Sequence, residues 1–363
     1  MNWELFKGLL AIDSTSGKER KVAEWLLERL EAPSKQAMEV GDGTLNLLLQ
    51  WGIPRVVFCT HMDTVPPYIA PKFPEGTGLS ETSLRDPSHK WASPSYAAEG
   101  GHSLGETCAL RKEDIIYGRG SCDAKGQIFA MYTACKELEA NGYTDFGLLL
   151  LAGEETGSWG AKAFAKTDFR APYLIVGEPT ENKMVSASKG TKSYDLTFKG
   201  EAFHSGYPQY GTSAVDLFND FYNKLKAKDF GLDRELGETT WNVGLLHSGN
   251  PQNILSPELT CRLYFRTTFA SHQTVQDWMA ALPENMTVKP NGIGDAPAHY
   301  MTLPGFDSAP AAFGSDAPHL SNFSHKAICG PGTIRHAHRD DEQVLVQDLQ
   351  TAVRLYVQMY KSL

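Results

Sequence analysis

Two adjacent glutamates, Glu154 and Glu155, follow an apolar stretch over residues 148–152 that carries no charge. A short apolar run bounded by turn residues is typical of a buried strand, and open α/β sheets bind their ligands at the carboxyl ends of strands. Neighbouring side chains of an extended chain point in opposite directions, so the two carboxylates could serve one site in different roles. Taken alone, however, the pair is more typical of the acidic first turn of a helix. Other residues must decide.

Further polar side chains stand where predicted strands end. The set comprises His61, Asp63, Asp123, Glu154, Glu155 and Glu178, together with His338 near the C-terminus. So many carboxylates at one sheet edge would repel one another without cations, so the set, with its two imidazoles, predicts a metal site. Histidine nitrogen with carboxylate oxygen suits zinc, cobalt or manganese. Even five ligands from this set of seven are too many for one open catalytic ion, but five suffice for two ions that share a bridging carboxylate.

The elements that would position these residues alternate between strand and helix. Strands are predicted near 37–40, 44–50, 55–60, 147–152, 172–176 and 327–329, and helices at 3–12, 17–31, 124–141, 157–166 and 343–361. Such alternation indicates an α/β fold, a mainly parallel sheet with helices on both faces. The catalytic metal-binding domain is therefore expected to comprise residues 1–182 and 293–363. Within it, residues 66–112 are rich in proline, glycine and serine and predict an extended insertion loop.

Residues 183–292 follow a different order of elements, β-α-β-β-α-β, which is the ferredoxin-like α+β arrangement. Their strands alternate apolar and polar residues, as expected for an antiparallel sheet with one solvated face. We expect this segment to be a second domain inserted into the first.

Composition excludes some classes of partner. The formal net charge of −9 argues against nucleic-acid binding and against an anionic membrane surface. No signal peptide and no bilayer-spanning apolar run are expected. The six cysteines form no CxxC motif, which predicts reduced thiols in a cytoplasmic protein.

Five motifs occur in an order that resembles the zinc aminoacylase-type metallopeptidase family. They are His61-x-Asp63, Gly118-Arg119-Gly120-x-x-Asp123-x-Lys125-Gly126, Glu154-Glu155, Gly177-Glu178-Pro179-Thr180 and His338-x-x-x-Glu342. The resemblance covers nearly the whole chain. This family includes acetylornithine deacetylase, succinyl-diaminopimelate desuccinylase, aminoacylases, dipeptidases and carboxypeptidases.

The resemblance implies a role for each residue of the set. One zinc would be held by His61, Asp123 and Glu178, and the other by Asp123, Glu155 and His338. Asp63 would orient His61 by hydrogen bonding to its far nitrogen. Glu154 would be the general base that activates a metal-bridging water and later protonates the leaving amine. A cis peptide bond is expected between Asp123 and Ala124. His336 lies close enough to be mistaken for a ligand, but motif spacing favours His338.

In the inserted domain the resemblance implies three substrate-binding residues, namely His204, Asn253 and Arg266. Without the family, His204 would be interpreted as a solvent-facing loop residue. Arginine suits a substrate carboxylate because its fork binds bidentately. Arg262 would share a strand face with Arg266, which is preferred on motif spacing only, and Lys189 is a fainter candidate.

The function expected on this basis is a cytoplasmic, homodimeric amidohydrolase with two Zn²⁺ per subunit, for which Co²⁺ or Mn²⁺ could substitute. It would remove the acyl group from an N-acyl amino acid, as acetylornithine and acetylcitrulline deacetylases of arginine biosynthesis do. The alternatives are a succinyl-diaminopimelate desuccinylase and a metallo-dipeptidase or carboxypeptidase. A non-catalytic metal-binding relative is the alternative of another class, and the presence of Glu154 argues against it.

Overall fold

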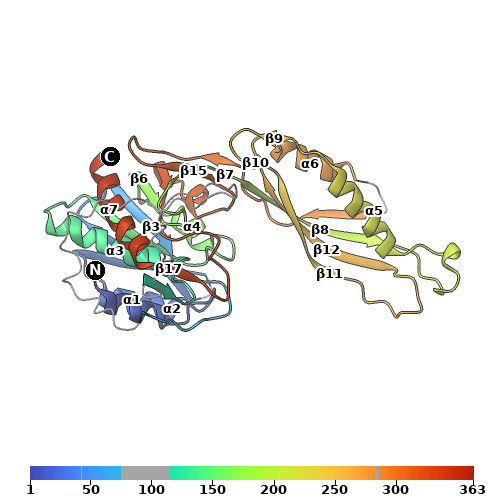
Figure 1. The fold of residues 1–363 in the computed structure, drawn as a ribbon, viewed down its shortest axis with the longest axis horizontal. Helices are drawn as coiled ribbons and strands as arrows, with labels where there is room; N and C mark the ends of the chain where they lie inside the picture. Colours follow the sequence, from blue (N-terminus) through green and yellow to red (C-terminus); the bar gives the residue numbers. More distant parts are fainter. Residues whose placement is uncertain (42, 75–113, 283–285) are drawn as a thin grey trace, which may run out of the picture. The chain divides into compact units, whose positions relative to one another are not determined.

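The computed structural model describes residues 1–41, 43–74, 114–282 and 286–363. These residues form two compact units, and the first comprises Met1–Asn182 with His319–Leu363 while the second comprises Lys183–Pro318 (Figure 1). Most of the predicted 66–112 insertion lies outside the described residues.

The first unit is built on a six-stranded sheet. Its strands are β1 (Ser34–Val40), β2 (Thr44–Trp51), β3 (Val56–His61), β5 (Phe146–Leu151), β6 (Ala171–Val176) and β16 (Phe323–Ile328). Their order across the sheet is β1-β2-β5-β3-β6-β16, in which β5, β3, β6 and β16 are mutually parallel and β1 and β2 form an antiparallel hairpin. Every residue of β3 and β5 is buried, which explains why both strands are apolar except for Thr60 and His61 at the end of β3.

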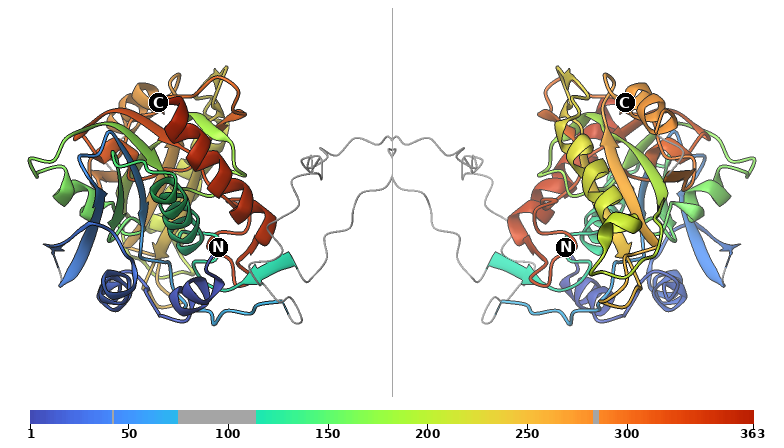
Figure 2. Two further views of the ribbon diagram at one scale, coloured as in Figure 1. Left: turned by 90° about the vertical axis from the view of Figure 1, so that its left-hand side faces the viewer. Right: turned by 90° about the vertical axis from the view of Figure 1, so that its right-hand side faces the viewer.

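Helices cover both faces of this sheet, which confirms the predicted fold class. They are α1 (Trp3–Leu10), α2 (Arg20–Arg29), α3 (Lys125–Ala140), α4 (Trp159–Phe164) and α7 (Val346–Ser362). The β3-α3-β5 and β5-α4-β6 connections cross the sheet in opposite directions, so right-handed crossovers place α3 and α4 on opposite faces. Helix α7 packs beside α3, as the two further views show (Figure 2).

A small two-stranded sheet joins distant parts of the first unit. Strand β4 (Ile115–Tyr117) pairs antiparallel with β17 (Gln343–Leu345). The prediction of a helix from residue 343 is therefore wrong at its start, because residues 343–345 pair as a strand and α7 begins at Val346. This pairing ties the segment before Asp123 to the segment after His338.

The second unit contains the predicted ferredoxin-like arrangement. Its four-stranded antiparallel sheet has the order β11 (Thr240–His247), β12 (Glu258–Thr267), β8 (Gly190–Lys199) and β13 (Met286–Pro290). Helices α5 (Ala214–Ala227) and α6 (His272–Ala280) pack on one face over a core that includes Leu196, Phe198, Leu263 and Phe265.

The second unit extends beyond the boundary at residue 292 that the sequence predicts. Strand β7 (Met184–Ser188) pairs with β14 (Ala298–His299) on one side and with β15 (Ser308–Ala311) on the other. Because this pairing joins both later strands to the segment that enters the unit, the second unit continues to Pro318. A short hairpin of β9 (Leu232–Asp233) and β10 (Gly237–Glu238) completes it.

Two features of the described residues relate to the expectations from composition. The five cysteines in the described part of the chain, which are Cys59, Cys122, Cys135, Cys261 and Cys329, are all buried free thiols. No helix among the described residues has both the length and the apolar character needed to cross a membrane.

Candidate metal centre and active site

The carboxyl ends of three parallel strands meet at one edge of the first unit's sheet. His61 is the last residue of β3, Glu154 and Glu155 follow β5 after a two-residue turn, and Glu178 follows β6. Asp123 comes from the loop that precedes α3. Because β3 lies between β5 and β6, the parallel order brings these residues together from distant parts of the sequence.

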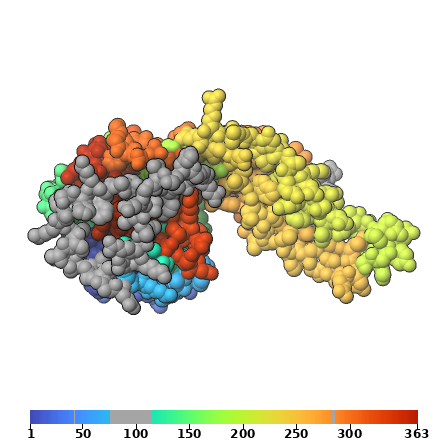
Figure 3. Space-filling view, viewed as in Figure 1, coloured from blue at the N-terminus to red at the C-terminus, as the bar shows by residue number. Residues whose placement is uncertain are grey.

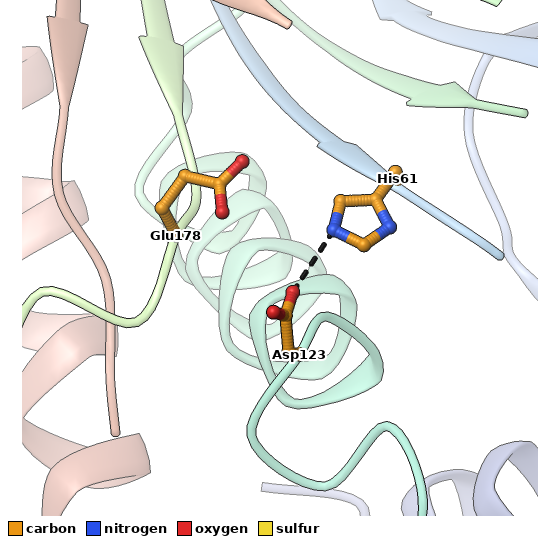
Figure 4. Close-up of side chains that lie close together, drawn as sticks. All are labelled: His61, Asp123 and Glu178. Carbon is orange, nitrogen blue, oxygen red and sulfur yellow. Dashed lines mark hydrogen bonds and ion pairs between the residues drawn. The ribbon is translucent and has the colours of Figure 1, made fainter. Parts of the chain in front are cut away.

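The first group of candidate metal ligands is His61, Asp123 and Glu178, all of which are buried. Each offers one ligand atom, and these atoms lie within 4.8 Å of one another. The Nε2 atom of His61 lies 3.0 Å from Oδ1 of Asp123, and the Glu178 carboxyl group faces the same space from the end of β6 (Figure 4).

The second group is Asp123, Glu155 and His338, whose ligand atoms also lie within 4.8 Å of one another. The Nε2 atom of His338 is 3.0 Å from Oε1 of Glu155 and 3.4 Å from Oδ2 of Asp123. Asp123 therefore presents one oxygen to each group. His336 is not part of this group; its ring contacts Gln343. His338 has a left-handed backbone conformation with φ of 63°.

Charge within the site explains what these residues can bind. Burial lowers the pKa of His61, but hydrogen bonds to Asp123 and Asp63 outweigh it and hold that pKa well above its usual value. Hydrogen bonds to Asp123 and Glu155 raise the pKa of His338 to about 10. The protonated imidazoles thus balance the negative charge of the carboxylates. A divalent cation bound at the same place would provide the same positive charge. The donor set of imidazole nitrogen and carboxylate oxygen fits zinc, cobalt or manganese.

Asp63 is fully buried, and it organises the turn that carries the two glutamates. Its carboxylate accepts hydrogen bonds from the amides of Glu154 at 3.0 Å and Glu155 at 3.2 Å, and from the Ser16 hydroxyl at 2.8 Å. Nδ1 of His61 is 3.0 Å from the main-chain oxygen of Asp63 and 3.4 Å from Oδ1 of its carboxylate. Asp63 therefore orients His61 chiefly through its main chain, while its side chain holds the glutamate turn.

Glu154 lies beside the metal ligands without belonging to either group. Its negative charge contributes to the raised pKa of His61, which places the carboxylate near the first group. A carboxylate next to the candidate ligands, on a residue whose main-chain amide donates to Asp63, is suitably placed for proton transfer.

Two residues that the sequence left without a role, Arg119 and Glu342, support the loop that carries Asp123, whose amide donates to Oε1 of Glu342 at 3.0 Å. Both are buried, and Oε2 of Glu342 accepts a hydrogen bond from Nη1 of Arg119 at 2.5 Å. Burial raises the pKa of Glu342 to about 7. The available signal was the place of both residues in the family motifs, Arg119 between Gly118 and Gly120 and Glu342 four residues after His338.

The residues predicted to bind substrate lie in the second unit. His204 and Asn253 are exposed on neighbouring segments, and the amide of Ser205 donates to the carbonyl of Asn253 at 2.9 Å. Arg262 forms an ion pair with Asp195, with Nε and Oδ1 2.8 Å apart.

Arg266 has different surroundings from Arg262, because its guanidinium stacks over the Tyr264 ring at 5.1 Å. Lys189 is largely buried and donates to the carbonyl of Glu238. Burial lowers the pKa of Lys189, the charge of Glu238 partly offsets this, and the charge of Arg266 lowers the pKa further. Unlike Arg262, Arg266 is not paired with Asp195.

A largely buried set of imidazoles and carboxylates at the carboxyl edge of an α/β sheet, with the more exposed His338 completing it and a further carboxylate beside it, is typical of a metal-dependent hydrolase. Comparison with known proteins gives the family. The description "Peptidase family M20/M25/M40" matches residues 98–362. A peptidase M20 domain-containing protein of Schizosaccharomyces pombe is 30% identical and covers 98% of this chain and 83% of its own length. The chain belongs to peptidase family M20/M25/M40.

Two further relatives bear on the fold and on the activity. A protein of Aspergillus oryzae named probable carboxypeptidase is 29% identical, and the match covers 98% of this chain and 86% of that protein. The crystal structure of an M20 family metallo-carboxypeptidase from Sulfolobus solfataricus shares the fold with a TM-score of 0.69 at 16% identity. That match covers 99% of this chain and 98% of the other.

Proposed function

We propose that this protein is a two-metal carboxypeptidase that hydrolyses the amide bond joining a C-terminal amino acid to the rest of a small peptide. The observation that carries the proposal is the pair of candidate ligand groups that share Asp123, with Glu154 beside them. The names of the curated relatives support a carboxypeptidase over the acetylornithine deacetylase that motif resemblance alone favours.

The residues proposed to hold the first metal ion are His61, Asp123 and Glu178, and those for the second are Asp123, Glu155 and His338. Ions bound there would supply Lewis-acid activation of water and of the scissile carbonyl group. Glu154 then takes a proton from the attacking water and returns it to the leaving amine nitrogen. Asp63 keeps Glu154 in place through the hydrogen bond to its amide.

The cationic pair of Arg266 and Lys189 is proposed to bind the free carboxylate of the departing amino acid. An arginine fork matches a carboxylate bidentately, and the ammonium of Lys189, whose charge interacts with that of Arg266, adds a second positive charge. A carboxypeptidase and an N-acyl amino acid deacylase both release an amino acid that bears this carboxylate. The N-acyl amino acid therefore remains the second candidate substrate, since the same two cations would recognise it.

A homodimer formed through the second unit is also proposed, with His204 and Asn253 serving the site of a partner subunit. Strand β11 is an edge of the four-stranded sheet, and it exposes Leu245 and Leu246 by 71% and 54%. The segment around His204 is likewise exposed, and it is visible in yellow-green in the space-filling view (Figure 3). An unpaired edge strand with adjacent apolar side chains is a natural surface for pairing with a second copy.

The experiment that tests the proposed activity is a hydrolysis panel with zinc-loaded protein. It compares N-blocked dipeptides that have a free C-terminal carboxylate, the same peptides as C-terminal amides, and N-acetyl amino acids. We expect cleavage of the free-acid peptides, little cleavage of the C-terminal amides, and slower cleavage of the N-acetyl amino acids.

Arg266→Met should raise KM for the free-acid peptides by 10-fold or more, since a hydrogen bond to a charged group contributes about 1.5–3 kcal/mol. Arg262→Met is the matched control, because that arginine is already paired with Asp195. Equal cleavage of acids and amides would contradict carboxylate recognition, and cleavage of N-acetyl amino acids alone would favour the deacylase.

A further inference from the structure

The loop that presents the bridging ligand is bound by a single buried carboxylate. Oε1 of Glu342 accepts hydrogen bonds from three main-chain amides, those of Gly120 at 2.9 Å, Cys122 at 3.1 Å and Asp123 at 3.0 Å. The other oxygen accepts from Arg119, so Glu342 receives four hydrogen bonds from one short segment of the chain. A carboxylate that gathers several amides in this way holds their backbone in one conformation.

The same segment leaves little room for another arrangement. Gly120 has φ of +85°, and a Cβ atom there would approach Cδ of Lys125 to 2.9 Å. Arg119 is anchored a second time, because its Nε donates to the carbonyl of Pro67 at 3.1 Å. The loop from Gly118 to Asp123 is therefore held to Glu342 and Pro67 by hydrogen bonds from its main chain and from the Arg119 side chain.

Glu342 also connects this loop to the segment that carries His338. The two residues are four positions apart, and the main-chain carbonyl of Glu342 accepts from the amide of Gly118 at 3.0 Å. The β4–β17 pairing continues the connection. A displacement of Glu342 would thus disturb Asp123, which belongs to both ligand groups, and His338, which belongs to one.

We propose that the buried Glu342 carboxylate, oriented by Arg119, is a positioning element that couples the two metal positions through its three amide contacts, so that disturbing those contacts weakens both ions together. This inference rests on the proposed two-metal function and adds residues to it that touch neither ion. Supporting residues around metal ligands typically change metal affinity by about 10- to 100-fold when they are replaced.

The test measures metal binding directly, by titrating metal-free protein with Co²⁺ and Zn²⁺ against a chelating dye and by following the Co²⁺ absorption bands. Wild type should bind two ions per chain. Glu342→Gln keeps the shape of the side chain but presents an amide to Arg119, and both binding steps should weaken by about 10- to 100-fold. His338→Ala should weaken one step more than the other, which separates loss of a ligand from loss of coupling.

A second variant keeps the test informative if Glu342→Gln folds poorly. In Arg119→Met/Glu342→Gln, the glutamine oxygen can still accept the three amides without facing a buried guanidinium. Metal affinity should recover toward wild type in this double variant, because the amide contacts position Asp123. No recovery in a folded double variant would overturn the proposed role of those contacts.

Two controls separate positioning from general stability. Asp341→Asn makes the analogous acid-to-amide change one residue away on the surface, where Asp341 pairs with Arg339, and should leave metal affinity unchanged. Tyr356→Phe removes a buried hydroxyl that donates to the Cys329 carbonyl, and should lower the melting temperature without weakening metal binding. The inference is refuted if Glu342→Gln binds two ions with wild-type affinity. It is also refuted if Tyr356→Phe lowers metal affinity by as much as Glu342→Gln does. If wild type itself binds no metal, the proposed function fails instead.

Discussion

Replacement of Asp63 by asparagine should destabilise the protein by about 3 kcal/mol at neutral pH. The carboxylate is fully buried and accepts three hydrogen bonds, from Ser16, Glu154 and Glu155. A hydrogen bond to a charged acceptor contributes about 1.5–3 kcal/mol and one to a neutral acceptor about 0.5–1.5 kcal/mol, so each bond loses about 1 kcal/mol. The amide group of asparagine would also point a donor at one of these donors.

The pH dependence of this effect follows from the ionised state of Asp63. Burial raises its pKa, but hydrogen bonds from His61, Ser16 and the Glu154 amide outweigh burial and hold it below the usual 3.8. A carboxyl group with a depressed folded-state pKa contributes stability above its unfolded pKa and loses it as the pH falls through the folded value. The difference between wild type and Asp63→Asn should therefore be constant from about pH 5 to pH 8 and shrink only in stronger acid.

Urea denaturation of the metal-free proteins measures the loss of stability. Dye competition measures metal affinity. In Asp63→Asn this affinity should fall by about 10- to 100-fold, because the turn that carries Glu155 becomes less well held. Asp13→Asn is the matched control. Asp13 also accepts from three donors, two on Thr15 and one on Lys18, but its side chain is 38% exposed and touches neither glutamate. A loss below about 0.5 kcal/mol in Asp63→Asn, or a loss equal to that of Asp13→Asn, would refute the proposed organising role.

Three other predictions address the base, the pH dependence of stability and the dimer. Glu154→Gln should lower kcat by about 10²- to 10⁴-fold while two ions stay bound; loss of metal instead would mean that the roles of Glu154 and Glu155 are exchanged. Burial, aided by Glu181, raises the pKa of Asp348 to about 6 from 3.8, so its ionisation costs stability as the pH rises through that interval. Asp348→Asn should accordingly stabilise the protein by about 2–3 kcal/mol at pH 8 but not at pH 4, and equal melting-temperature shifts at both pH values would contradict this. Leu245→Asp should convert a dimer to a monomer in light scattering, and a wild-type monomer would refute the proposed interface.

Much of the first unit could be predicted from the sequence because its signals are local. The apolar runs of β3 and β5 are buried on both faces, so they contain no alternation and end abruptly at polar residues, which marks His61 and the two glutamates. The alternation of β8 and β12 in the second unit is equally local and indicates its one-sided sheet. The type of each element, and the residue types that close it, depend on neighbours a few positions away.

Pairing over long distances could not be predicted in this way. Residues 343–345 have helix-compatible composition, but they pair with β4, more than 200 positions earlier in the chain, and so form a strand. In the same way β7 pairs with β14 and β15, so the second unit ends at Pro318. These outcomes depend on which strand edge is available in the folded chain, which no local pattern records.

The residue types alone indicated a carboxylate- and imidazole-rich site suited to metal ions, since so many carboxylates at one sheet edge need compensating positive charge. Tertiary structure decided how the set is divided. It placed Glu155 beside His338 and Asp123, left Glu154 outside both groups, and put His336 against Gln343. It also decided which buried carboxylates hold the loops, because Asp63 and Glu342 find their amide donors only after strands and loops from distant parts of the chain have come together.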